Sequence, residues 1–394
     1  MKKLLFKLKN KLLAFREFSR VNFRPRLKKL GNYALKNWIV IFAVLAALVS
    51  CFFVKPDKQY LHYPEYKTLA CLFSLLLILR ALKHTKIFKI GAAKILEHIH
   101  NQRTLCLLLV FLPAFFALFI TNDVATLSFV PFAIVLLSMA NCEKLTPRVI
   151  ILQTMACRLS GVISPLGNAQ NLFLIDFYNF PPQWFIMNLW PLAVVGYSIT
   201  LLGCLTIRRG EVSILPVGQY KIQGAKIAIY SALFVLTVLS IFNILPYLIV
   251  TPIVLLTILI VHSFAYRKVK YSIIVMFLAF FILAGNLQRI EGIDQFLTSA
   301  LSGREYVLSV LASQILTNTP VALLFPNFTD AVVPLMLGIN VGKFGAAQLS
   351  NFMVFNMYSK YDTSHNFGRK LLFVSFLYLF VLFGVGFLVI KFIN

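Results

Sequence analysis

The chain consists of long runs of apolar residues separated by short segments that carry most of its basic residues. Runs such as Thr104–Ile120 and Leu371–Ile390 are long enough, as helices, to cross about 30 Å of hydrocarbon. Apolar residues make up 59% of the chain and charged residues only 13%, whereas soluble domains contain about half and about a quarter. These features exclude a soluble globular protein and predict a polytopic membrane protein.

We expect every apolar segment to be helical, because a membrane-spanning backbone must satisfy its own hydrogen bonds. The predicted segments are 37–54, 68–82, 104–120, 124–140, 149–175, 184–206, 226–243, 246–264, 271–288, 305–325, 328–358 and 371–392. The mixed segment 289–304 is expected to be a loop.

The Lys and Arg residues between these segments predict the orientation, because basic loops stay in the cytoplasm. Residues 1–36, 80–103, 141–148 and 207–221 are basic, whereas 176–183 contains no Lys or Arg. We therefore expect a multi-pass protein of the plasma membrane, the inner membrane of a bacterium, with its N-terminus in the cytoplasm.

The basic residues do not indicate a nucleic-acid partner, despite a formal net charge of +25. They lie mainly in loops between apolar runs and in the N-terminal tail, residues 1–36. Leu4, Leu8 and Leu12 in this tail recur at helical spacing, which fits a surface helix on anionic lipid. A solvated cytoplasmic tail fits the same residues equally well.

Polar triplets at 121–123 and 317–319 each divide an apolar stretch into two arms. Polar backbone at bilayer depth is tolerated only inside protein or along a cavity, so we expect two re-entrant hairpins. For the first triplet, a short outer loop between two full spans also fits. Two further interruptions, at 164–171 and 338–342, contain Gly together with Asn and predict broken helices.

These features pair between the two halves of the chain. The predicted fold is all-α, an inverted repeat of about five elements each with two re-entrant hairpins and two interrupted helices. Its parts are a basic tail (1–36), a first repeat (37–206), a connector helix (207–245) and an inverted second repeat (246–394). Inverted repeats with paired broken helices are typical of secondary transporters.

The interruptions supply the candidate binding residues, because unwound backbone and short polar side chains coordinate ions and small anions. The set is Thr121, Asn122, Asp123, Gly167, Asn168, Gln170, Asn171, Thr317, Asn318, Thr319, Gly338, Asn340 and Gly342. A coupling Na⁺ would use Asn122, Asp123, Asn168, Asn318 and Asn340, and no other cofactor is expected. Each motif taken alone would also fit helix packing.

Three charged residues are expected within the spans. Asp123 could bind Na⁺, carry a proton or pair with a basic residue, because an intramembrane carboxylate is a functional candidate. Arg158 is a candidate partner for Asp123 or a contact for an anion. Lys343 is the corresponding cation of the second half, or a lysine that reaches to the interface.

The segments TNDVA at 121–125, GNAQN at 167–171 and TNTP at 317–320 resemble the ion transporter superfamily. This group contains citrate, di- and tricarboxylate and arsenite permeases and some Na⁺/H⁺ antiporters, and the resemblance covers about 37–392. It implies inverted repeats, hairpin tips that help to form substrate and Na⁺ sites, and often a homodimer. The sequence departs from the family at two positions. Asp123 stands where dicarboxylate carriers have Thr, which resembles the Asn-Asp tip of arsenite permeases. Ala169 stands where many relatives have Pro.

The sequence thus predicts a secondary active transporter of a small anion or oxyanion, carboxylate- or arsenite-like, coupled to H⁺ or Na⁺. Alternatives are a Na⁺/H⁺ antiporter without an organic substrate and a passive anion channel. An enzyme is not expected, because no Ser/His/Asp set or paired carboxylates occur at catalytic spacing.

Overall fold

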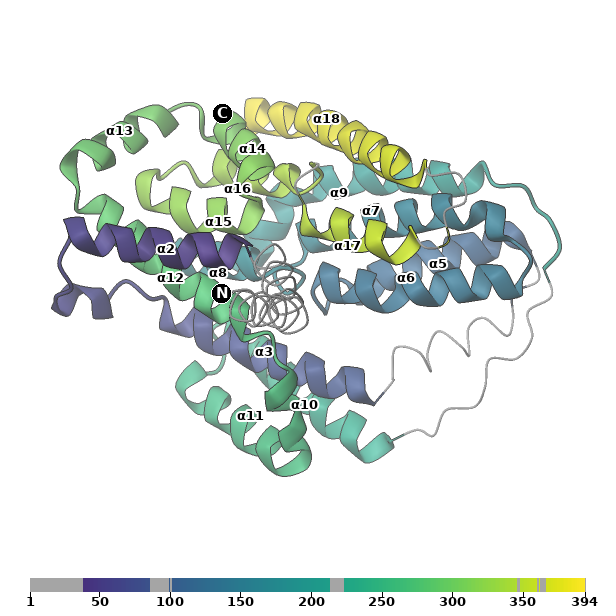
Figure 1. The fold of residues 1–394 in the computed structure, drawn as a ribbon, viewed down its shortest axis with the longest axis horizontal. Coiled ribbons are helices and arrows are strands. Elements are labelled where there is room, and N and C mark those ends of the chain that lie inside the picture. Colours follow the sequence, from purple (N-terminus) through teal and green to yellow (C-terminus); the bar gives the residue numbers. More distant parts are fainter. Residues whose placement is uncertain are drawn as a thin grey trace, which may run out of the picture.

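The computed structural model describes residues 38–85, 99, 101–212, 223–345, 348–359, 361 and 366–393. Within these residues the regular secondary structure is helical, as Figure 1 shows. The prediction of an all-α membrane protein is therefore confirmed. The basic tail, residues 1–36, lies outside the described residues.

The helices of the first half follow the predicted apolar segments closely. Short polar or Gly- and Pro-containing stretches separate them, because Pro and Gly disfavour helix continuation. These helices are α2 (Trp38–Phe53), η1 (Lys58–Leu61), α3 (Tyr66–His84), α5 (Gln102–Phe116), α6 (Asn122–Met139), η2 (Glu143–Leu145), α7 (Thr146–Ile163), α8 (Ala169–Phe177) and α9 (Pro182–Leu205).

The connector and the second half follow in the same way. Residues 289–304, predicted to be a loop, instead contain α13, with the acidic residues Glu291 and Asp294 in its first turn. An acidic first turn is favourable to a helix N-terminus. The elements are α10 (Gly224–Ile241), α11 (Tyr247–His262), η3 (Ser263–Lys268), α12 (Tyr271–Gln288), α13 (Glu291–Leu301), α14 (Glu305–Ile315), α15 (Asn318–Leu324), η4 (Phe325–Phe328), α16 (Val332–Gly342), α17 (Leu349–Tyr358) and α18 (Phe367–Ile393).

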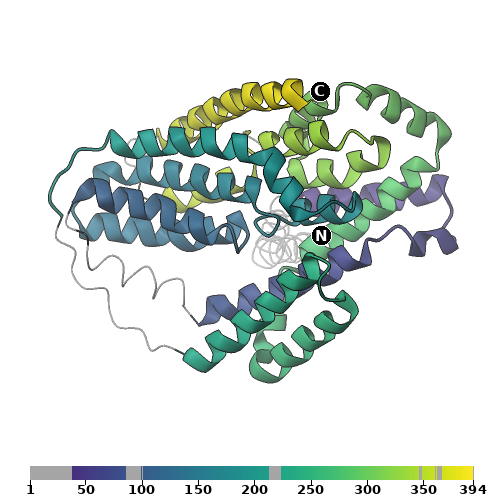
Figure 2. The same cartoon turned by 180° about the vertical axis from the view of Figure 1, so that it is seen from behind.

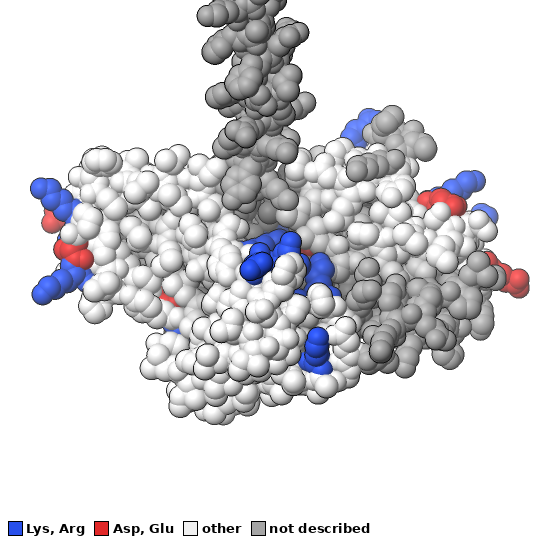
Figure 3. All heavy atoms as spheres, turned by 60° about the horizontal axis from the view of Figure 1, so that its bottom comes forward, with Lys and Arg blue, Asp and Glu red and all other residues white. Residues whose placement is uncertain are grey.

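The surface of the molecule is suited to lipid. Among the described residues, six helical segments are long and apolar enough to cross a membrane: α6, α9, α10, α11 with η3, α12 and α18. Large apolar side chains such as Phe52, Phe380 and Phe392 are exposed. On the face in Figure 3, most of the charged side chains lie at the two ends of the long axis and near the centre, and most of the described surface between them carries no Lys, Arg, Asp or Glu.

Two helical hairpins, α5–α6 and α14–α15, lie in different halves of the molecule. Helices α5 and α6 pair at one end of the long axis in both cartoon views, and α14 and α15 lie in the other half (Figures 1 and 2). The first hairpin turns at 117–121, and the second at 316–317. The polar triplets at 121–123 and 317–319 thus begin the second arm of each hairpin.

The second helix break was predicted at 338–342, and this position is wrong. Helix α16 continues through these residues to Gly342, and the described residues that follow it, 343–345 and 348, are not helical. A methyl group on Gly338 would lie 2.5 Å from the Tyr306 carbonyl oxygen, and one on Gly342 would lie 2.5 Å from Ser313 Cβ. The two glycines therefore allow α16 to approach α14 closely, as small residues do at membrane helix contacts.

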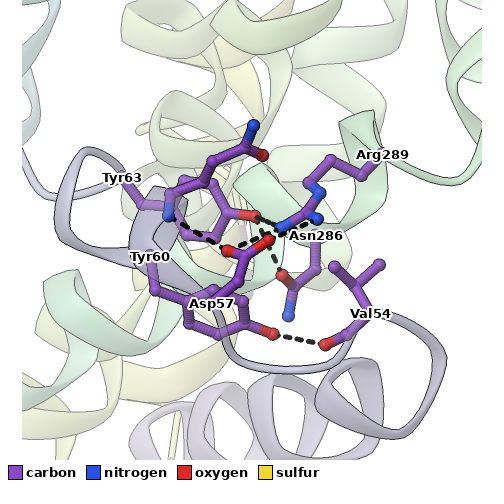
Figure 4. A network of polar contacts seen from close by, with 7 residues as sticks. Val54, Asp57, Tyr60, Tyr63, Asn286 and Arg289 are labelled. Atoms are coloured by element: carbon purple, nitrogen blue, oxygen red, sulfur yellow. Dashed lines mark hydrogen bonds and ion pairs between the residues drawn. The ribbon is translucent and has the colours of Figure 1, made fainter.

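A polar network joins the two halves at one end of the molecule (Figure 4). Arg289, at the end of α12, forms an ion pair of 2.7 Å with Asp57, which begins η1, and donates to the Tyr63 hydroxyl at 3.1 Å. Tyr63 donates to Asn286 Oδ1 at 3.2 Å. The Arg289 guanidinium, by hydrogen bonding to the carboxylate, lowers the pKa of Asp57 from its ordinary value of 3.8.

We expect Gly338→Ala to destabilise the protein by about 1–3 kcal/mol, because the new methyl group would push α14 from α16. The measurement is the apparent melting temperature in detergent. Gly384→Ala, in α18, is the matched control, because nothing lies within 4 Å of its added carbon. Equal melting temperatures for wild type and Gly338→Ala would contradict the close packing.

The Asp57–Arg289 pair predicts a pH-dependent difference in stability. A carboxylate whose pKa is lowered on folding stabilises the folded state above its ordinary pKa of 3.8 and loses this contribution as the pH falls through the folded value. Wild type should therefore melt above Asp57→Asn at neutral pH, and the difference should shrink on acidification below pH 3.8. A difference that is constant with pH would show that the charge of Asp57 is irrelevant.

Candidate functional site

The break between α7 and α8 is held by a serine and tied to the first hairpin. Ser164 Oγ accepts hydrogen bonds from the backbone N–H groups of Leu166 at 3.2 Å and Gly167 at 3.1 Å. The Gly167 carbonyl accepts a hydrogen bond of 3.1 Å from the backbone N–H of Asn122. The predicted break and the predicted hairpin tip are thus in direct contact.

Three buried side chains converge on one carbonyl at the end of α7. Helix α7 ends at Ile163, so the carbonyl of Gly161 has no partner in a following turn. It accepts hydrogen bonds from Asn168 Nδ2, from Asn171 Nδ2 at 2.8 Å and from Lys343 Nζ at 2.7 Å. A methyl group on Gly161 would lie 2.5 Å from the Asn168 amide nitrogen, so the close approach requires glycine.

Arg158 lies about one turn before Gly161 on α7 and is 1% exposed. Its Nη2 donates to Ser350 Oγ at 2.8 Å and to Asn351 Oδ1 at 2.7 Å, both at the start of α17. Among the residues that the structure describes, its Nε and Nη1 have no hydrogen-bond partner. Buried donors of a charged group are costly when they are unpaired, so these two nitrogens are candidates for binding a ligand.

The tip of the first hairpin supplies the carboxylate of the site. Thr121 precedes α6, Asn122 is buried, and Asp123 is partly buried in the first turn. Asp123 interacts electrostatically with both Arg158 and Lys343. Among the described residues, Asp123 forms no ion pair within 4 Å with either cation, so its pairing with Arg158 stays a prediction.

The tip of the second hairpin contacts the same interrupted helix. Thr319 Oγ1 donates to Gln170 Oε1, in the first turn of α8, at 3.2 Å. Asn318 is buried at the start of α15. Thr317 is also buried and has a φ of +70°, a left-handed conformation that is strained for a residue with a branched Cβ. Both tips thus meet the segment around the first break.

The second break repeats the arrangement of the first with different donors. The carbonyl of Gly342, the last residue of α16, accepts hydrogen bonds of 3.1 Å from Gln314 Nε2 and from Gln348 Nε2 and one of 3.3 Å from the backbone N–H of Gly345. Asn340, in the last turn of α16, donates to the Met336 carbonyl and accepts from Lys343 Nζ at 3.2 Å. Gly338 lies away from this centre, against α14.

The space beside the first break is small. A cavity of about 10 Å³ is lined by Thr121, 165–166, 168–169 and four leucines of α3. This is about the volume that one water molecule needs, so the site is closed to a larger solute in this conformation. A cavity of about 620 Å³ lies elsewhere, beside Trp184, Glu305 and Phe387.

Two of the residues predicted to bind Na⁺, Asn168 and Asn340, already form hydrogen bonds within the protein. Asn340 Oδ1 accepts a hydrogen bond from the Lys343 ammonium, and the Asn168 amide nitrogen donates one to the Gly161 carbonyl oxygen. Within the part of the chain that is described, no group of three His, Cys, Asp or Glu residues could hold a metal ion. Any Na⁺ here would depend on carbonyl and amide oxygens and on Asp123.

Sequence reasoning missed several members of this cluster. Gly161, Ser350 and Asn351 were not among the predicted residues, and Arg158 and Lys343 were considered only as separate charges. The two residues at 350–351 follow the true second break, so placing this break correctly would have identified them. Nothing in the sequence indicates that Lys343 contacts Gly161, because the two lie 182 residues apart.

Comparison with known proteins gives two relatives that are transport or membrane proteins. An uncharacterized transporter of Methanocaldococcus jannaschii is 26% identical over 316 residues, 77% of this chain and 83% of its own length. The inner membrane protein YbiR of Escherichia coli is 24% identical over 299 residues, 74% of this chain and 80% of its own length.

A family model described as "Citrate transporter" matches residues 28–350, which include both hairpins, both breaks and the contacts around Gly161. The resemblance found in the hairpin and break motifs is thereby confirmed, and the protein is a multi-pass membrane transporter. The chain belongs to the citrate transporter family.

Proposed function

We propose that this protein is a secondary active transporter of a small anion, a carboxylate or an oxyanion, driven by H⁺ or Na⁺. The N-terminus and the loop at 141–148 would face the cytoplasm, as their basic residues indicate. The anion would bind between the two helix breaks, next to Arg158.

The observation that carries this proposal is the state of the Arg158 guanidinium. It is buried between α7 and α17, two of its donor nitrogens have no partner among the described residues, and the hydrogen bonds of the third are to neutral oxygens. Guanidinium groups bind carboxylates and oxyanions through paired N–H donors. An anion accepting from Nε and Nη1 would complete the hydrogen bonding of this side chain.

The balance of charge supports an anion rather than a cation as the substrate. Arg158 and Lys343 are two buried cations, and Asp123 is the carboxylate that interacts with both. With all three groups ionised, the cluster carries one net positive charge. A single anionic group would neutralise it.

The closed geometry supports alternating access. The small cavity at the first break cannot admit a citrate-sized solute, so the helices around it must separate during transport. The two hairpins lie in different halves of the molecule (Figure 1), and both contact the α7–α8 segment. Movement of the bundle that carries the hairpin tips relative to the other helices would open the site to one side at a time.

A Na⁺/H⁺ antiporter is the second candidate, and Asp123 is the observation that favours it. This partly buried carboxylate near two buried cations could exchange one cation for another without an organic substrate. Uptake of radiolabelled anions into proteoliposomes separates the two, because an antiporter would accumulate none of them.

We expect Arg158→Ala to reduce anion uptake by roughly 10- to 100-fold, because hydrogen bonds to a charged group contribute about 1.5–3 kcal/mol. The measurement is proteoliposome uptake of citrate, succinate, phosphate and arsenite. Arg158→Lys should also lose most uptake, because an ammonium lacks the paired donors.

Arg209→Ala is the control for this experiment, because Arg209 is exposed in the loop after α9. Monodisperse elution in detergent establishes that each variant is folded. Wild-type uptake by a folded Arg158→Ala would show that this guanidinium has only a structural role.

We expect Asp123→Asn to retain exchange of the anion across the membrane but to lose concentrative uptake, because the variant cannot change its charge during the cycle. The measurement is uptake with imposed pH and Na⁺ gradients that are varied independently, alongside exchange without a gradient. The gradient that drives wild type identifies the coupling ion. If uptake by wild type and by Asp123→Asn depends in the same way on the pH and Na⁺ gradients, Asp123 has no role in coupling.

A further inference from the structure

Lys343 connects the two broken helices through its terminal nitrogen. It follows the last residue of α16, and its Nζ lies 2.7 Å from the Gly161 carbonyl of α7 and 3.2 Å from Asn340 Oδ1. The residue is 2% exposed. Its side chain is therefore directed inward, and the alternative reading of a lysine that reaches to the membrane interface is wrong.

The position of this nitrogen is one that suits a bound cation. The carbonyls freed at the C-terminal end of a helix carry a partial negative charge, and such carbonyls coordinate Na⁺ in transporters with broken helices. The Gly161 carbonyl is in the last turn of α7, and Asn340 adds an amide oxygen from the opposite half. Both oxygens are ligands of the kind that Na⁺ prefers.

We propose that the Lys343 ammonium is a built-in cation that occupies this position in place of a free Na⁺. The inference rests on the proposed function only in taking the two breaks as the binding centre. It assigns Lys343 a role in ion specificity: the wild-type protein does not bind Na⁺ between Gly161 and Asn340. Any coupling ion then acts elsewhere in the cluster.

The covalent attachment of the ammonium to the chain has a further effect on the charge of the site. A bound Na⁺ can leave during the transport cycle, whereas the ammonium of Lys343 stays attached to α16. The amino group at this position therefore stays in the cluster when the substrate has been released. Among the described residues, Asp123 is the acidic group whose interaction with this ammonium is evident.

The test is the thermal stability of the purified protein in NaCl compared with choline chloride at equal concentration, without any anionic substrate other than chloride. Wild type should show no Na⁺-specific stabilisation that depends on Asn340. Lys343→Ala removes the ammonium and leaves both oxygens and a space, so Na⁺ should raise its melting temperature by a few degrees. Lys343→Met fills the space without a charge and should show no such rise.

Lys370→Ala is the matched control, because Lys370 is exposed on α18 and should leave the Na⁺ response unchanged. If Lys343→Ala does not yield folded protein, Lys343→Ser provides the same test, since serine adds one more oxygen to the vacated position. Methylammonium, a free counterpart of the lysine headgroup, should stabilise whichever small variant is folded.

Two results would overturn the proposal. One is a Na⁺-specific stabilisation of wild type that is lost in Asn340→Ala, because Na⁺ would then already bind beside Lys343. The other is a folded Lys343→Ala or Lys343→Ser that responds to neither Na⁺ nor methylammonium. Neither measurement involves anion uptake, so failure of the proposed transport activity would be seen separately.

Discussion

Breaking a helix inside a membrane frees carbonyl groups that lipid cannot hydrogen-bond, and the centre of this protein is arranged around that constraint. The Gly161 carbonyl is satisfied by two asparagines that follow the first break and by Lys343 from the other half. The Gly342 carbonyl is satisfied by Gln314 and Gln348. The positions of α8, α14, α16 and α17 relative to α7 all follow from these contacts.

Much of the fold could be predicted because its signals are local. Apolar runs of membrane-spanning length mark the helices, and polar triplets within them mark the hairpin tips at Asn122 and Asn318. The first break was also placed correctly, since Ser164 and Gly167 interrupt an otherwise apolar run. The division of the chain into inverted repeats, and the binding roles of the tip residues, stay predictions.

The errors come from features that depend on partners distant in sequence. In the sequence, Gly338 and Gly342 are equally compatible with a helix break and with a close contact between helices. The proximity of α14 in the structure shows that they form a close contact. Residues 291–301 form a helix although their composition is mixed, because an acidic first turn and a partly apolar face suffice at a surface. The inward direction of Lys343 depends on the Gly161 carbonyl, which no local pattern reveals.

The contact between Arg158 and the start of α17 has a consequence for biosynthesis. Arg158 enters the membrane with α7, but Ser350 and Asn351 are translated 192 and 193 residues later. Until they emerge from the ribosome, the inserted first half holds a guanidinium that lacks these acceptors, and such a helix is retained poorly in lipid. Arg158 can therefore reach these acceptors only when residues 350–351, in the last eighth of the chain, have been made, and a chain that ends before them would leave these donors of α7 unpaired.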